Sequence, residues 1–131
     1  MNGYTLIVDN RPERQASLVR ILDRLSRQGF SIPPVKICTT PDQVIRFSAI
    51  QSCPIIFTGV DLPGMNGFTM IERVRELNRR TNFILLADNK EYVIQALLLK
   101  LRLSGSIMGQ PDMDNVTDQL NNLWYPLSES E

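Results

Sequence analysis

The sequence predicts an α/β domain in which a five-stranded parallel sheet is covered by helices on both faces. Short apolar runs alternate along the chain with segments whose apolar residues recur at helical spacing, and this alternation is typical of parallel sheets. The run 54–57 is apolar throughout, as expected of a strand that is buried on both faces. The chain of 131 residues is long enough to form one domain with a substantial core.

The strands are expected at the apolar runs, which lie between clusters of polar, proline and glycine residues. Five runs meet this description: residues 4–8, 35–38, 54–57, 83–86 and 106–108. The run at 106–108 is the weakest of these patterns. The first helix follows the first strand, with Leu18, Leu22 and Leu25 at helical spacing, and Pro12 and Gly29 suit its first turn and its exit.

The other helices are expected between the later strands and after the last one. The second begins with a capping box, in which Thr40 is the N-cap residue and Gln43 stands three residues on, and it continues through Phe47. The fourth is expected over residues 90–101. The apolar positions of the third and fifth helices are Phe68, Ile71, Val74 and Leu77, then Met113, Val116, Leu120 and Leu123.

Right-handed crossovers between parallel strands leave few arrangements for such a sheet. We expect the flavodoxin-like strand order 2-1-3-4-5, which is one of the two common orders of doubly wound sheets. Ligand sites in these sheets lie beyond the carboxyl ends of the strands. In this chain those ends fall at residues 9–10, 58–59, 87–88 and 109–110.

Composition argues against several classes of function. Basic and acidic residues number 14 each, so the chain lacks the basic excess that nucleic acid binding usually needs. It has no histidine, the commonest metal ligand and general base. Cys38 and Cys53 are interpreted as buried reduced thiols of a cytoplasmic protein, although a disulfide between them stays open. No apolar run is long enough to span a bilayer, and we expect no membrane partner.

The most specific motif is the segment 55–67, which reads Ile-Ile-Phe-Thr-Gly-Val-Asp-Leu-Pro-Gly-Met-Asn-Gly. It resembles the signature around the phosphoacceptor aspartate of CheY-like receiver domains, the phosphorelay modules of two-component response regulators. The resemblance covers roughly residues 4–123. It implies a cytoplasmic signalling domain rather than an enzyme, within a transcriptional regulator. Glu91-Tyr92 and Trp124-Tyr125-Pro126 resemble receivers of LytTR-type regulators more than the chemotaxis receiver.

A working receiver of this family holds Mg²⁺ with carboxylates, accepts the phosphoryl group on an aspartate, and contacts it through a hydroxyl and a lysine. The resemblance places the acidic pair at Asp9 and Asn10, so one carboxylate has become an amide. The acceptor position falls on Gly59, which has no side chain to phosphorylate. Asp61 takes the place that offers Mg²⁺ a backbone carbonyl, and Ala87 takes the place of the hydroxyl.

The lysine position depends on the register chosen for the last strand, and it falls on Gly109 or on Gln110. Neither residue is a lysine. We therefore expect no catalytic residues and no metal site, with Mg²⁺ binding lost or weak. The favoured interpretation is a pseudo-receiver that acts as a phosphorylation-independent interaction or dimerisation module. The alternatives are a divergent receiver phosphorylated on Asp61 or Asp9, and a small-molecule sensor that uses the vacated crevice.

The predicted fourth helix carries more apolar residues than one buried stripe requires. Val93, Ala96, Leu97 and Leu101 are assigned to the inner face, which leaves other apolar residues for a protein partner or a homodimer. The candidate interface residues are Ile94, Leu98, Leu103, Met108 and Leu120. Scattered exposed leucines are the alternative interpretation. The receiver-like domain is expected to span residues 1–124, followed by a tail or linker start at 125–131.

Overall fold

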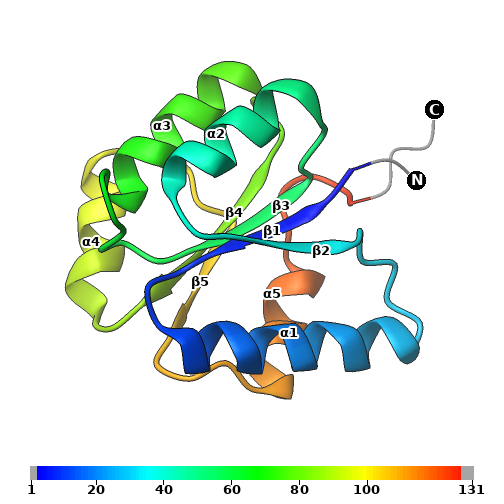
Figure 1. The fold of residues 1–131 in the computed structure, drawn as a ribbon. Helices are drawn as coiled ribbons and strands as arrows, with labels where there is room; N and C mark the ends of the chain where they lie inside the picture. The colour runs from blue at the N-terminus through cyan, green and yellow to red at the C-terminus, as the bar shows by residue number, and fades with distance from the viewer. Residues whose placement is uncertain (1–2, 128–131) are drawn as a thin grey trace.

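The computed structural model describes residues 3–127 as a five-stranded parallel sheet with helices packed on both faces (Figure 1). The strands are β1 (Thr5–Val8), β2 (Val35–Cys38), β3 (Ile55–Thr58), β4 (Asn82–Ala87) and β5 (Gly105–Met108). The helices are α1 (Pro12–Arg27), α2 (Pro41–Ile50), α3 (Gly67–Leu77), α4 (Lys90–Leu98) and α5 (Met113–Asn121). The order β2-β1-β3-β4-β5 confirms the predicted flavodoxin-like topology.

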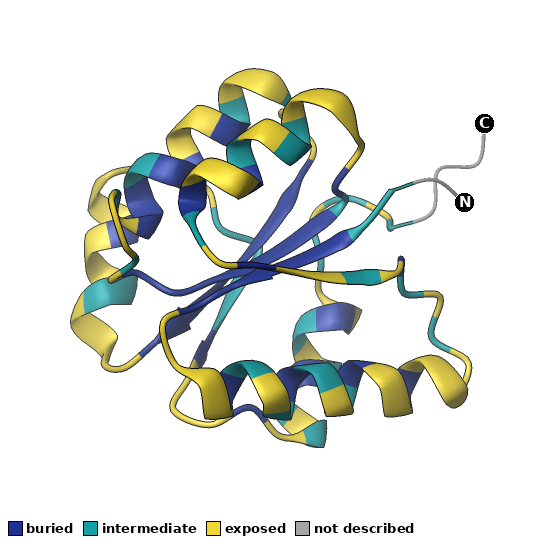
Figure 2. Ribbon diagram, in the orientation of Figure 1, coloured by how far each residue is buried: buried dark blue, intermediate teal, exposed yellow. Residues whose placement is uncertain are grey.

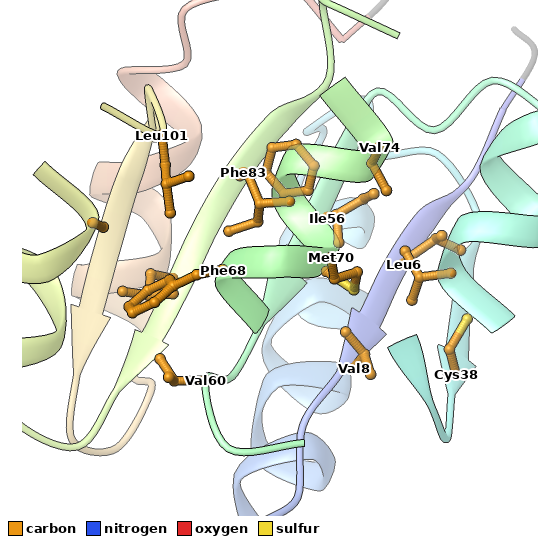
Figure 3. Close-up of a cluster of buried hydrophobic side chains, with 14 of the residues drawn as sticks. Leu6, Val8, Cys38, Ile56, Val60, Phe68, Met70, Val74, Phe83 and Leu101 are labelled. Carbon is orange, nitrogen blue, oxygen red and sulfur yellow. The ribbon is translucent and has the colours of Figure 1, made fainter. Parts of the chain in front are cut away.

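The core consists of two apolar layers, one on each face of the sheet. Helices α1 and α5 cover one face, and α2, α3 and α4 cover the other (Figure 1). Leu6 and Val8 of β1 join the cluster that includes Met70 of α3 (Figure 3), whereas Ile7 between them joins the cluster that includes Leu18 of α1. Alternate residues of a strand point to opposite faces, so both kinds of position must be apolar. This is why the central strands are buried along their length (Figure 2).

The helix starts follow the local sequence signals. At α2, the Thr40 side chain accepts a hydrogen bond from the backbone N–H of Gln43 at 3.2 Å, as predicted. The Gln43 side chain bonds to the backbone N–H of Thr39 at 2.7 Å, one residue earlier than a capping box requires. Asn66 and Asn89 cap α3 and α4 in the same way, through their side-chain oxygens.

Helix α4 ends at Leu98, three residues before the predicted end. The N–H of Leu101 bonds to the carbonyl of Ala96, and the N–H of Lys100 bonds to that of Leu97. With Lys100 in the left-handed region at φ 58°, this is a Schellman motif. The position is usually glycine, as Gly29 is at the end of α1. The sequence has no glycine at this position, so the helix predicted from the apolar pattern extended too far, into the turn after α4.

The shorter helix changes which apolar residues face the core. Leu97, assigned to the inner face, is 76% exposed, and Leu101 is buried from beyond the helix end. Leu103, predicted as an interface residue, packs against the core cluster because it leads into β5. Leu120, also predicted at the interface, is only 9% exposed and belongs to the core cluster between the sheet and helices α1 and α5. Ile94, Leu98 and Met108 are exposed as expected.

Asn82, the first residue of β4, fixes the segment that follows α5. Its fully buried side chain donates to the carbonyls of Pro54 (3.0 Å) and Tyr125 (2.8 Å). Its oxygen accepts from the N–H of Tyr125 (3.0 Å) and from the hydroxyl of Ser104 (2.8 Å). The amide therefore binds Tyr125 as a neighbouring strand would. The predicted tail thus begins with a residue that is tied to the sheet, and its last part, 128–131, lies outside the described residues.

Both cysteines are buried with free thiols. Burial raises the pKa of the Cys53 thiol to about 11 and also raises that of Cys38, so neither is a reactive thiolate at neutral pH. Within residues 3–127, no helix has the length and apolar character that a membrane crossing requires.

The Asn82 bonds predict a specific loss of stability. Asn82→Ala removes the bonds to Ser104 and Tyr125, while the carbonyl of Pro54 keeps its bond to the backbone N–H of residue 82, so the free energy of unfolding should fall by about 2–3 kcal/mol. Asn78→Ala is the control, because that side chain makes only an exposed bond to the N–H of Arg80. Urea denaturation of both variants gives the comparison. Equal, small losses would show that the Asn82 bonds do not hold the segment in place.

Candidate functional site

The predicted crevice residues come together at the carboxyl ends of the strands. Val8 of β1 pairs with Thr58 of β3, and the N–H of Gly59 continues this ladder to the carbonyl of Val8 at 2.9 Å. On the other side, the N–H of Gly109 bonds to the carbonyl of Ala87 at 3.1 Å. Three of the strands therefore end at the same edge of the sheet, and the residues that come immediately after them are Asp9, Gly59 and Gly109.

The centre of the crevice is a buried ion pair between Asp9 and Arg14. The Nε of Arg14 lies 2.5 Å from Oδ2 of Asp9, and its Nη2 lies 2.6 Å from Oδ1. The Asp9 side chain is fully buried, and that of Arg14 is 5% exposed. This two-pronged geometry uses both carboxylate oxygens and is the strongest form of such a pair.

Asp88, just after β4, extends the pair into a network of two carboxylates and two guanidinium groups. Its Oδ1 lies 2.9 Å from Nη1 of Arg14 and 3.1 Å from Nη2 of Arg11. Burial by itself lowers the pKa of the Arg14 guanidinium, but its bonds to Asp9 and the charges of Asp9 and Asp88 outweigh burial and raise it. Arg14 is therefore a fixed cation, and the carboxylates around it neutralise its charge.

Gly59 lies directly against this pair. A Cβ atom at position 59 would stand 2.5 Å from Oδ1 of Asp9 and 3.5 Å from Nη2 of Arg14. A contact of 2.5 Å is too short for a Cβ atom, so a side chain here would have to displace the Asp9 carboxylate. The ion pair and the bare backbone at Gly59 are thus complementary in shape.

The loop from β3 to α3 is held close to the same backbone. The N–H of Gly67 donates to the carbonyl of Val60 at 2.8 Å, and a Cβ atom at position 67 would collide with the carbonyl of Gly59. Asn66 then caps α3 through the N–H of Thr69 at 3.0 Å. The Gly-Met-Asn-Gly part of the motif therefore shapes this loop and starts the helix, whatever chemistry the crevice has.

The remaining predicted residues surround the pair without adding a nucleophile beside it. Asp61 is exposed and accepts a hydrogen bond from the hydroxyl of Tyr92 in α4 at 2.8 Å. That bond raises the pKa of Tyr92 above its ordinary value. Asn10 is exposed, and Ala87 is fully buried. A pocket of about 380 Å³ beside the pair is lined by both candidates for the lysine position, Gly109 and Gln110, together with Arg11, Glu13, Arg14 and Asp88.

The residues present do not fit a Mg²⁺ site. Mg²⁺ needs oxygen ligands in near-octahedral order, but both oxygens of Asp9 already bind Arg14. Within residues 3–127, no three Asp, Glu, Cys or His side chains gather in a way that could hold a metal. A guanidinium group in contact with the one buried carboxylate would also repel an arriving cation.

Arg14 is the site residue that sequence reasoning missed. Charged side chains are usually exposed, so an arginine near the start of a helix attracts little notice. A signal was nevertheless present, because Arg14, Leu18, Leu22 and Leu25 share the buried stripe of α1. A charged residue on such a stripe, five residues after a strand-end aspartate, is a candidate for a buried pair.

Neither a protein-family model nor a curated protein matches this sequence. The fold is similar to that of a CheY-like response regulator receiver domain protein from Methanospirillum hungatei JF-1, with a TM-score of 0.72 and 17% identity over 92% of each chain. A receiver domain of a sensor histidine kinase from Pseudomonas aeruginosa PAO1, solved with magnesium in its active-site cleft, gives a TM-score of 0.76 at 17% identity over 93% of this chain and 98% of that chain.

The bacteriophytochrome response regulator RtBRR gives a TM-score of 0.83 at 13% identity over 99% of this chain and 82% of that chain. These identities are low, and the likeness therefore concerns the fold. The chain has the five-stranded CheY-like fold of response-regulator receiver domains. The residues in its crevice decide what that fold can do here.

The buried pair predicts a large loss of stability when one partner is removed. Arg14→Gln leaves the Asp9 carboxylate buried without its cation, so the free energy of unfolding should fall by about 3 kcal/mol or more. Arg27→Gln removes the exposed pair with Asp23 and should cost less than about 1 kcal/mol. The double change Asp9→Asn with Arg14→Gln should recover part of the loss in urea denaturation. A loss for Arg14→Gln no larger than for Arg27→Gln would contradict the buried pair.

Proposed function

We propose that this chain is a receiver-like signalling domain that does not accept a phosphoryl group and works as a phosphorylation-independent interaction or dimerisation module. The observation that carries the proposal is the glycine at the end of β3, with the Asp9–Arg14 pair packed against it. The segment 55–67 and the fold suggest that the module belongs to a response regulator, and we place it within a transcriptional regulator.

Phosphoryl transfer depends on a positioned nucleophile and on fixed charge that stabilises the transition state. Position 59 supplies no nucleophile, and Ala87 supplies no hydroxyl. The positive charge of Arg14 is already used, because Asp9 and Asp88 bind it from two sides. The nucleophile, the hydroxyl and an available positive charge are therefore all missing, which supports an absent reaction rather than a slow one.

The alternative acceptors are poorly placed. Asp9 is buried with both oxygens bonded to Arg14, so neither is free to attack a phosphodonor. Asp61 is accessible, but it lies in the loop and binds Tyr92 rather than a cation. A small molecule in the crevice would have to compete with the network of Asp9, Arg14, Asp88 and Arg11, which argues against the sensor alternative at this site.

The proposed interaction surface is the exposed apolar face of α4. It consists of Ile94, Leu97 and Leu98, and Leu97 and Leu98 are each more than 70% exposed. Met108, at the end of the edge strand β5, is also exposed. Several large apolar side chains exposed on one helix favour an interaction site there. A second copy of the chain would bury the same face twice in an isologous dimer.

The first test is phosphorylation. Incubation with acetyl phosphate and Mg²⁺ should leave the intact mass of the wild-type protein unchanged. Gly59→Asp should not restore labelling, because the new carboxylate meets Oδ1 of Asp9 and the charge of Arg14 while the hydroxyl and lysine are still missing. A receiver with a complete site, treated in parallel, is the positive control. An Mg²⁺-dependent phospho-adduct on the wild-type protein or on the Gly59→Asp variant would overturn the proposal.

The second test is assembly. The wild type should be a dimer in sedimentation velocity at tens of micromolar, and Leu98→Glu should shift it to monomer, because a charge would be buried in an apolar interface. Ile50→Glu is the matched control, since Ile50 is 80% exposed on α2 and lies outside the α4 face. Both variants should keep the circular dichroism spectrum of the wild type. A monomeric wild type would rule out the homodimer.

A further inference from the structure

The sheet edge opposite the crevice carries a groove of about 540 Å³ between α3, the turn after α4 and Tyr125. This edge holds the beginnings of β4 and β5, at Asn82 and Gly105. Five of the protein's 14 basic residues line the groove: Arg75, Arg79, Arg80, Lys100 and Arg102. Glu72 and Glu76 line it as well, which leaves a formal excess of three positive charges in a chain whose net charge is zero.

Three of these cations are not neutralised by carboxylates of the fold. No ion pair within residues 3–127 involves Arg79, Lys100 or Arg102, although two glutamates line the same groove. All three side chains belong to exposed residues. Positive charge gathered in one groove raises the local concentration of anions there.

The walls of the groove are fixed by Arg75. Its guanidinium donates to the carbonyls of Thr81 and Arg102, each at 2.6 Å, and to that of Arg79 at 3.1 Å. It also stacks over the ring of Phe83 at 4.9 Å. These bonds join the end of α3 to the turn after α4, so the groove is preorganised. Burial lowers the pKa of Arg75, and the charge of Arg102 acts in the same direction, whereas Tyr125 acts in the opposite direction.

Two of the cations occupy backbone positions that favour glycine. Lys100 and Arg102 have φ angles of 58° and 62°, and within residues 3–127 they are the two non-glycine residues with positive φ. The same place in the Schellman motif of α1 is taken by Gly29. A long basic side chain in the left-handed region costs free energy that glycine would avoid. Two such residues in one wall of the groove favour a binding role for their side chains, which would offset this cost.

We propose that this groove binds a small polyanion of the phosphorylated-metabolite class. Its volume lies within the range of small-molecule sites. Arg79, Lys100 and Arg102 supply the charge, and Leu99 offers apolar surface to the rest of the ligand, while the guanidinium of Arg80 lies over the ring of Tyr125 at 5.6 Å. The proposal concerns the edge away from the crevice and does not depend on whether the crevice accepts a phosphoryl group.

The experiment is a titration of the ¹⁵N-labelled full chain with inorganic pyrophosphate at low salt, followed by backbone amide shifts. The shifts should saturate with a dissociation constant below about 1 mM and centre on residues 76–80 and 99–102. Lys100→Gln and Arg79→Gln should each weaken binding at least about fivefold. Lys90→Gln, an exposed lysine at the other end of α4, is the matched control and should change it less than about twofold.

Three results would overturn the proposal. The first is a set of shifts that stays linear with pyrophosphate concentration or spreads over all basic residues, which would indicate screening alone. The second is a Lys90→Gln variant that loses as much affinity as Lys100→Gln. The third is citrate or a glutamate octapeptide binding as tightly as pyrophosphate, which would mean that the groove selects carboxylates or acidic peptides instead.

Discussion

The buried pair between Asp9 and Arg14 is the interaction on which the crevice depends. An unpaired carboxylate in this position would face a desolvation cost of several kcal/mol, and the guanidinium removes most of that cost through two short bonds. Arg14 reaches Asp9 because α1 begins directly after β1 and turns its buried stripe towards the sheet. The same fold therefore supplies both the carboxylate and the cation, with no ligand required to balance the charge.

The two edges of the sheet then differ in electrostatic character. At the carboxyl edge, Asp9 and Asp88 neutralise Arg14 and Arg11, so the crevice is locally balanced and closed to further cations. At the opposite edge, the groove retains an excess of positive charge. The anion site proposed for this groove is therefore remote from the crevice.

The type and order of the elements could be predicted because strand burial and helical spacing are local patterns that this chain follows closely. The strand-end residues Asp9, Gly59 and Gly109 could be predicted for the same reason. The end of α4 could not, since Lys100 occupies a position where the usual signal is glycine. The assignment of Leu97 to the inner face was wrong for the same reason, since Leu97 is exposed close to the end of the shorter helix. Arg14 was missed because its role depends on a tertiary contact, and residue type alone assigns an arginine to the surface.

Gly59 and Arg14 are best understood as one structural feature rather than two. A side chain at position 59 would collide with the Asp9 carboxylate in the place where Arg14 holds it. The pair can take this geometry because residue 59 has no side chain, and the geometry in turn leaves no room for an acceptor. An aspartate introduced at position 59 would therefore have to displace the Asp9 carboxylate from this pair. The proposed inability to accept a phosphoryl group therefore rests on Asp9 and Arg14 as much as on Gly59, because a side chain at position 59 would have to disrupt a buried ion pair.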